Sequence, residues 1–148
     1  MDVAAAYNCQ ILLPKDVVVA VEFKLGAAHR LASSDDVADG EMILDAGAES
    51  LAAATAFLDR CSTIVWNGPM GAFEIPPFDA ATTALACAVA AKTQRDGLMS
   101  VAGGGDTMAA LANAGVNDQF SYVSTAGGAF LEWLEGKRLP GVEALRID

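Results

Sequence analysis

The chain has 148 residues, 53% of them hydrophobic, which is enough apolar side chain to bury the core of one domain. Nineteen acidic and nine basic residues give a net charge of −10, which argues against nucleic acid as a partner. Apolar runs all stay shorter than the roughly 18 residues of a membrane span, and the first residues lack the pattern of a secretory signal, so no membrane contact and a cytoplasmic location are expected.

The first half of the chain predicts the end of a helix, three strands and a further helix. Val3–Tyr7 is typical of a helix end, and this abrupt start suggests a truncated chain. The strands are predicted from apolar, mostly β-branched runs, and the polar stretch Leu25–Asp39 predicts irregular loops. These runs are Gln10–Leu13, closed by Pro14, Val17–Val21 and Met42–Leu44. A helix from Glu49 to Arg60 follows, with one face formed by Leu51, Ala54, Thr55 and Leu58.

The second half predicts three more strands, each followed by a helix. The strands are Thr63–Trp66, Leu98–Ala102 and Tyr122–Ser124. The first of these helices is marked by the spacing of Phe78, Thr82, Leu85, Ala86 and Val89, and the second by Met108, Leu111 and Ala112. The third opens within Thr125–Gly128 and ends at Gly136, after which Leu139–Val142 is expected to be extended.

This alternation predicts an α/β fold, a Rossmann-like three-layer α/β/α arrangement with a parallel sheet, here incomplete. Ligands of such sheets bind beyond the carboxyl ends of the strands. Three unusual loops follow strands in this chain and are therefore expected at one edge of the sheet. They are Asn67–Glu74, Gly103–Thr107 and Ser124–Gly128.

The glycines of the second loop predict a phosphate site. Gly103–Gly105 lets a ligand approach the backbone, and the helix that follows offers free N–H groups. Asp106 repels phosphate unless a cation such as Mg²⁺ lies between them, and the net charge of −10 adds to this repulsion. The alternative is a tight strand–helix turn in which Asp106 is only a helix cap.

Nucleophilic and metal-binding side chains are few. Cys9, Cys61 and Cys87 are far apart and lack the spacing of a zinc site or a disulfide framework. His29 is the only histidine, so the usual nucleophile–histidine arrangements have a single candidate base. A nucleophile–histidine mechanism is therefore disfavoured.

The three loops carry a resemblance to a known family. Their motifs are Trp66–Pro69 with Gly71, Phe73 and Glu74, then Gly103–Thr107, then Ser124–Gly128 with Leu134–Lys137 and Leu139–Val142. In this order and spacing they resemble the C-terminal part of phosphoglycerate kinase. Leu12–Pro14 and Asp45 also fit, so the resemblance covers nearly the whole chain and only the last part of the family's length.

The resemblance implies a glycolytic kinase that moves a phosphoryl group between 1,3-bisphosphoglycerate and ADP, giving 3-phosphoglycerate and ATP. The family has two Rossmann-like domains that close on a hinge. By this resemblance, residues 1–148 are the second part of the C-terminal, Mg-nucleotide-binding domain, and the N-terminal domain that binds the acid substrate is absent. The cofactor is Mg²⁺ with ADP or ATP.

The resemblance also implies residue roles. Leu44, Pro69 and Ala72 surround the adenine, and Glu74 accepts hydrogen bonds from the ribose. Asn67 lies near the transferring end of the nucleotide. Gly104, Gly105 and Thr107 line the phosphates, and Asp106 coordinates Mg²⁺. Gly127 and Gly128 donate N–H groups to the phosphoryl group in flight. Without the motif, Glu74 reads as an exposed loop carboxylate and Asn67 as a turn former.

Two departures from the family stand out. Ala126 occupies a position where many relatives have glycine. The basic substrate domain and the lysine-bearing phosphate loop are missing, so 3-phosphoglycerate and 1,3-bisphosphoglycerate are reached only through the absent domain, and the chain alone is expected to be inactive.

The sequence leaves two alternative functions. The first is a non-catalytic Mg-nucleotide-binding or interaction module that kept the fold. The second is part of a dinucleotide-dependent dehydrogenase, which is disfavoured because Gly103–Gly105 lacks the GxGxxG spacing.

Overall fold

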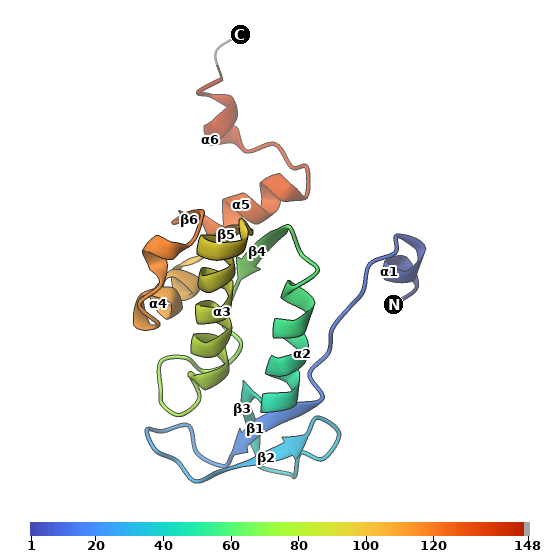
Figure 1. Ribbon diagram of the computed structural model, residues 1–148, viewed down its shortest axis with the longest axis vertical. Helices are drawn as coiled ribbons and strands as arrows, with labels where there is room; N and C mark the ends of the chain where they lie inside the picture. The colour runs from blue at the N-terminus through green and yellow to red at the C-terminus, as the bar shows by residue number, and fades with distance from the viewer. Residues whose placement is uncertain (147–148) are drawn as a thin grey trace. The chain divides into compact units, whose positions relative to one another are not determined.

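The computed structural model describes residues 1–146, which divide into two units (Figure 1). One unit holds residues 1–60 and 70–85, and the other holds residues 61–69 and the chain from residue 86 onward. We name them the antiparallel unit and the parallel unit after their sheets. Helix α3 (Ala80–Asp96) begins in the first and ends in the second.

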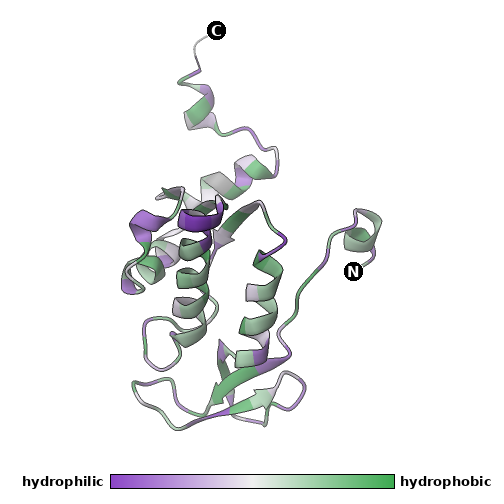
Figure 2. Ribbon diagram, in the orientation of Figure 1, coloured by the Kyte–Doolittle hydropathy of each residue, from purple (hydrophilic) through white to green (hydrophobic). Residues whose placement is uncertain are grey.

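The antiparallel unit is built on a three-stranded sheet. Strand β1 (Asp16–Ala20) lies between β2 (His29–Ser33) and β3 (Met42–Ala46) and is antiparallel to both. Its residues are hydrophobic almost throughout (Figure 2), because this central strand is covered on both faces. Val17 and Val19 pack with Ala32 on one face, and Ala20 packs with Leu44 and Phe78 on the other.

Two helices complete this unit. Helix α1 (Asp2–Ala6) is short and carries no buried residue. Helix α2 (Ala48–Leu58) agrees with the predicted helix. The four residues predicted to share a face are buried or half-buried, and Ser50 is buried as well. A carboxylate from β1 fixes the start of α2: the Asp16 oxygens accept the N–H groups of Glu49 and Ser50 at 3.0 and 2.7 Å.

Two predictions for this unit are wrong. Residues 10–13 form no strand, and Ile11, Leu12 and Leu13 are exposed. A strand needs a neighbour to bind its backbone groups, and no described strand pairs with this segment. Strand β2 was missed because it is an edge strand with one buried residue, Ala32, so its sequence shows no apolar alternation. The antiparallel pairing of β1 with β2 and β3 was not foreseen either, because the alternation of strands and helices indicated only a parallel sheet.

The parallel unit matches the predicted α/β class. Strands β4 (Thr63–Asn67), β5 (Met99–Gly103) and β6 (Tyr122–Ser124) are parallel, in the order β4-β5-β6. The helical elements after β5 are α4 (Gly105–Asn113), the 3₁₀ turn η1 (Asn117–Gln119), α5 (Gly127–Leu134) and α6 (Pro140–Glu143). Trp66 and Phe120 meet in its core with ring centroids 6.2 Å apart.

Smaller differences have local causes. Residues 139–142 were expected to be extended, but Pro140 occupies the first turn of α6, where its missing N–H costs nothing. Phe78 is fully buried ahead of α3, while Thr82, Leu85, Ala86 and Val89 form the predicted buried face of that helix. In α4, Ala112 is exposed and Ala110 takes the inward position. No helix within residues 1–146 is long and apolar enough to cross a bilayer.

Candidate functional site

The predicted edge of the parallel sheet exists. Asn67 pairs in register with Gly103, and Gly103 with Ser124, so three strands end level with one another. The chain therefore leaves β4, β5 and β6 at the same edge, as the sequence predicted for its glycine-rich loops.

Two glycine backbones touch at this edge. A Cβ on Gly127 would lie 2.4 Å from both the nitrogen and the Cα of Gly104, which leaves no room for any side chain. Gly104 itself has φ +104°, a conformation that favours glycine. Gly105 and Gly128 differ, because a Cβ there would meet no atom within 4 Å. The surface beside Gly105 and Gly128 is therefore open to a ligand.

Thr107 joins two of the loops. Its side chain is buried, and its hydroxyl oxygen accepts the N–H of Gly68 at 2.7 Å. The amide oxygen of Asn67 lies 3.2 Å from the position of a Cβ on Gly104. The structure thus brings Asn67, Gly104, Thr107 and Gly127 together, with the Thr107 hydroxyl already engaged by the protein.

The helices at this edge start without caps. The residues that precede α4 and α5, Gly104 and Ala126, make no side-chain cap hydrogen bond. Within residues 1–146, no acceptor is found for the N–H groups of residues 105–107 or 127–129. Free N–H groups at a helix start, together with the helix dipole, favour an anion.

Asp106 lies in the first turn of α4 and is exposed. No group of three or more His, Cys, Asp or Glu side chains that could hold a metal ion occurs in the described part of the chain. A single exposed carboxylate suits Mg²⁺, which binds one or two protein carboxylates together with phosphate oxygens. A single exposed carboxylate does not suit a metal ion whose ligands all come from the protein.

The residues expected around the nucleoside lie mainly in the antiparallel unit. Leu44 is buried at β3, and its carbonyl accepts the N–H of Ala72 at 2.7 Å, so the structure brings these two together. Glu74 is exposed two residues further on, and Pro69, at the end of the parallel unit's first segment, is half-buried.

Sequence reasoning treated Asp45 only as a family match. Its side chain is 2% exposed, and its oxygens accept the N–H groups of Ala46 and Ala81, each at 2.9 Å. Burial raises the pKa of the Asp45 carboxyl, and the nearby charge of Asp79 adds to the increase. The sequence did contain a signal for Asp45: a short apolar strand that ends in aspartate just before a turn.

The pKa of the buried Asp16 carboxyl shifts in the opposite direction to that of Asp45. Burial raises the pKa of the Asp16 carboxyl, but the hydrogen bonds from the Ser50 hydroxyl and from the N–H groups of Glu49 and Ser50 outweigh it, and the pKa is lowered. A Cβ on Gly47 would lie 2.2 Å from this carboxylate. Asp16 and Gly47 thus form a closed start for α2.

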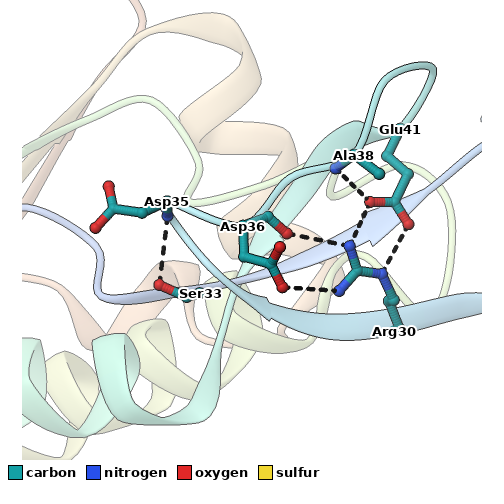
Figure 3. A network of polar contacts seen from close by, with 6 residues as sticks. All are labelled: Arg30, Ser33, Asp35, Asp36, Ala38 and Glu41. Carbon is teal, nitrogen blue, oxygen red and sulfur yellow. Dashed lines mark hydrogen bonds and ion pairs between the residues drawn. The ribbon is translucent and has the colours of Figure 1, made fainter.

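A separate polar network joins Arg30 on β2 to the segment that connects β2 to β3 (Figure 3). Arg30 donates to both carboxylate oxygens of Glu41, at 2.8 and 2.6 Å, and to the carbonyl of Asp36. The Arg30 hydrogen bonds and the N–H of Ala38 lower the pKa of the Glu41 carboxyl. Both carboxylate oxygens of Glu41 accept hydrogen bonds from this part of the chain, so the network fixes the connection between β2 and β3.

Comparison with known proteins identifies the family. Residues 1–137 match the family described as phosphoglycerate kinase. The chain belongs to the phosphoglycerate kinase family. It is 64% identical over 143 residues to the phosphoglycerate kinase of Xanthobacter flavus and 63% identical over 146 residues to that of Xanthobacter autotrophicus.

Solved phosphoglycerate kinases share the fold. The enzyme from Coxiella burnetii superposes with a TM-score of 0.87 at 47% identity, and the one from Pyrococcus horikoshii with 0.78 at 26%. These matches cover 96% and 97% of this chain but 36% and 34% of the solved chains. The match to Xanthobacter flavus covers 97% of this chain and 36% of the relative, and the match to Xanthobacter autotrophicus covers 99% and 37%. The chain thus spans about a third of the length of its relatives.

Proposed function

We propose that this chain is the nucleotide-binding part of a Mg-dependent phosphoglycerate kinase, which transfers a phosphoryl group between 1,3-bisphosphoglycerate and ADP in glycolysis. The observation that carries the proposal is the glycine-lined edge of the parallel sheet, where α4 and α5 begin without caps. Membership of the phosphoglycerate kinase family supports it. We expect such an enzyme to act in the cytoplasm.

The roles in the parallel unit follow from these contacts. Gly104 and Gly105 allow the phosphates to approach the backbone, and Thr107 holds the Asn67 loop through the N–H of Gly68. Asp106 would hold Mg²⁺ against the phosphates, and the bound ion would offset phosphate charge in a chain of net charge −10. We place Asn67 near the transferring end of the nucleotide.

Transfer of a phosphoryl group needs positioning and charge stabilisation more than a protein nucleophile. The free N–H groups of Gly127 and Gly128 at the start of α5 would donate to the transferred phosphoryl group. In the direction of ATP formation the nucleophile is a phosphate oxygen of ADP, so no general base is required. This agrees with a chain whose only histidine lies on a strand of the other unit.

For the nucleoside we propose Leu44, Pro69 and Ala72 around the adenine and Glu74 at the ribose. The hydrogen bond between the Ala72 N–H and the Leu44 carbonyl supports a shared role for these two residues. Binding of 3-phosphoglycerate is left to the part of the relatives that this chain does not span.

A chimera tests the activity. The matching 143-residue segment of the Xanthobacter flavus relative is replaced by this chain, and ATP formation from 1,3-bisphosphoglycerate and ADP is measured by a coupled assay. We expect the chimera to catalyse Mg-dependent transfer and the 148-residue chain alone to be inactive. A folded chimera without transfer activity would contradict the proposal, and so would turnover by the chain alone at the rate of the chimera.

A further inference from the structure

Asp45 joins two elements of the antiparallel unit. It lies at the end of β3, where one carboxylate oxygen accepts the N–H of Ala46 and the other accepts the N–H of Ala81 in the first turn of α3. The side chain is 2% exposed. The distance between the end of β3 and the start of α3 is therefore set by this carboxylate.

Residues 70–74, which we call the Ala72 loop, are hydrogen-bonded to both β3 and α3. The Ala72 N–H donates to the carbonyl of Leu44 at the end of β3, and the Met70 N–H donates to the buried hydroxyl of Thr82 in α3 at 2.9 Å. A shift of α3 away from β3 pulls the two anchors of the loop apart.

The loop also lies directly against the carboxylate. A Cβ on Gly71 would lie 2.4 Å from an oxygen of Asp45 and 2.6 Å from the carbonyl oxygen of Leu44. The backbone of Gly71 is thus in contact with the Asp45 side chain, and only glycine fits there. Asp45 fixes the loop by its hydrogen bonds to the flanking elements and by this contact.

We propose that Asp45 is a positioning residue for nucleoside recognition: its buried carboxylate holds the Ala72 loop so that Ala72 and Glu74 meet the adenosine of the nucleotide. The inference rests on the proposed function, since it assigns these two residues to the nucleoside. Asp45 itself contacts no ligand in this proposal.

Asp16 provides a matched control in the same unit. It too is a buried aspartate whose carboxylate accepts backbone N–H groups at the start of a helix, here α2. Within residues 1–146, its carboxylate accepts hydrogen bonds from Glu49 and Ser50 and none from the Ala72 loop. A purely structural role predicts the same consequences for both aspartates, and a positioning role predicts different ones.

The test compares Asp45→Asn with Asp16→Asn in the 148-residue chain, using calorimetric titration with Mg-ADP and amide hydrogen exchange. We expect Asp45→Asn to weaken Mg-ADP binding about tenfold and to speed exchange of the Ala72 amide about tenfold. Asp16→Asn should speed exchange at Glu49 and Ser50 and leave the Kd within about twofold.

Equal effects of the two variants on the Kd would overturn the proposal, and so would unchanged exchange at Ala72 in Asp45→Asn. Absence of Mg-ADP binding by the unmodified chain would instead contradict the proposed function, and with it the assignment of the loop to adenosine.

Gly71→Ala decides the question if Asp45→Asn does not fold, because it displaces the loop without removing the Asp45 carboxylate. Gly141→Ala is its control, since a Cβ there would meet no atom within 4 Å. We expect weaker Mg-ADP binding from Gly71→Ala alone. Unchanged binding in a folded Gly71→Ala chain would overturn the proposal.

Discussion

The two units differ in how their helices begin. In the antiparallel unit, buried carboxylates accept the first N–H groups: Asp16 does so for α2 and Asp45 for α3. In the parallel unit, α4 and α5 follow Gly104 and Ala126, which supply no side-chain cap. A helix start that already holds a carboxylate has no place for a second anion. The comparison therefore favours the parallel unit as the phosphate side of the proposed nucleotide site.

The largest expected effect lies where two glycine backbones meet. In Gly127→Ala the new Cβ would fall 2.4 Å from backbone atoms of Gly104, which cannot move aside as a side chain can. We expect a loss of about 3 kcal/mol or more in the free energy of unfolding, at the upper end for overpacking, measured by urea denaturation.

Gly128→Ala is the control for stability, because it adds the same methyl group to the same helix in open space. Its stability should be unchanged or higher by about 0.5–1 kcal/mol, since alanine favours the helix. Equal losses of unfolding free energy in Gly127→Ala and Gly128→Ala would show that the close approach of Gly104 and Gly127 does not restrict residue 127 to glycine.

A second prediction separates the two buried aspartates by pH. The pKa of Asp16 is lowered on folding, so its contribution to stability is present above about pH 4, the unfolded value, and is lost as the pH falls through the folded pKa. The pKa of Asp45 is raised, so its contribution is present below about pH 4 and is lost as the pH rises through the folded pKa.

The measurement is the difference in unfolding free energy between the unmodified chain and each Asn variant, from pH 2 to 7. The loss in Asp16→Asn should grow with pH, with most of the change below about pH 4. The loss in Asp45→Asn should shrink with pH, with the change above about pH 4. Parallel pH profiles for the two variants would contradict the contrast between them.

The parallel unit was predictable because its signals are local. Apolar runs that end in glycine-rich turns predicted β4, β5 and β6, and parallel strands bring the following loops to one edge without further information. The contact between Gly104 and Gly127 could not be predicted, since it depends on how closely the backbones approach. The family resemblance, carried by the same loops, was confirmed over residues 1–137.

The antiparallel unit was predicted less well because its signals are distant in sequence. The Asp16 carboxylate accepts hydrogen bonds from N–H groups 33 and 34 residues away in the sequence, and the Asp45 carboxylate accepts one from 36 residues away. No local sequence pattern records such pairings. The Gln10–Leu13 run has the composition of a strand but no described neighbour, so composition alone gave the wrong answer. The roles of Leu44, Ala72 and Glu74 stay predictions.

The most direct test of the nucleotide site is a titration of the chain with ADP, with and without Mg²⁺, followed by Trp66 fluorescence. Trp66 is buried beside Asn67, and its indole N–H donates to the carbonyl of Gly68, so it reports on the loop that Thr107 holds. The exposed Trp133 adds a background that is measured in the same variants.

Two variants that each remove one negative charge from the parallel unit are compared, Asp106→Asn at the start of α4 and Asp118→Asn in η1, both exposed. We predict that the chain binds ADP saturably and only with Mg²⁺. Asp106→Asn should weaken this binding about tenfold or more, because one charged contact is lost. Asp118→Asn should leave the affinity unchanged. Equal affinity of the two variants, or no saturable signal from a chain that circular dichroism shows to be folded, would contradict the proposed site.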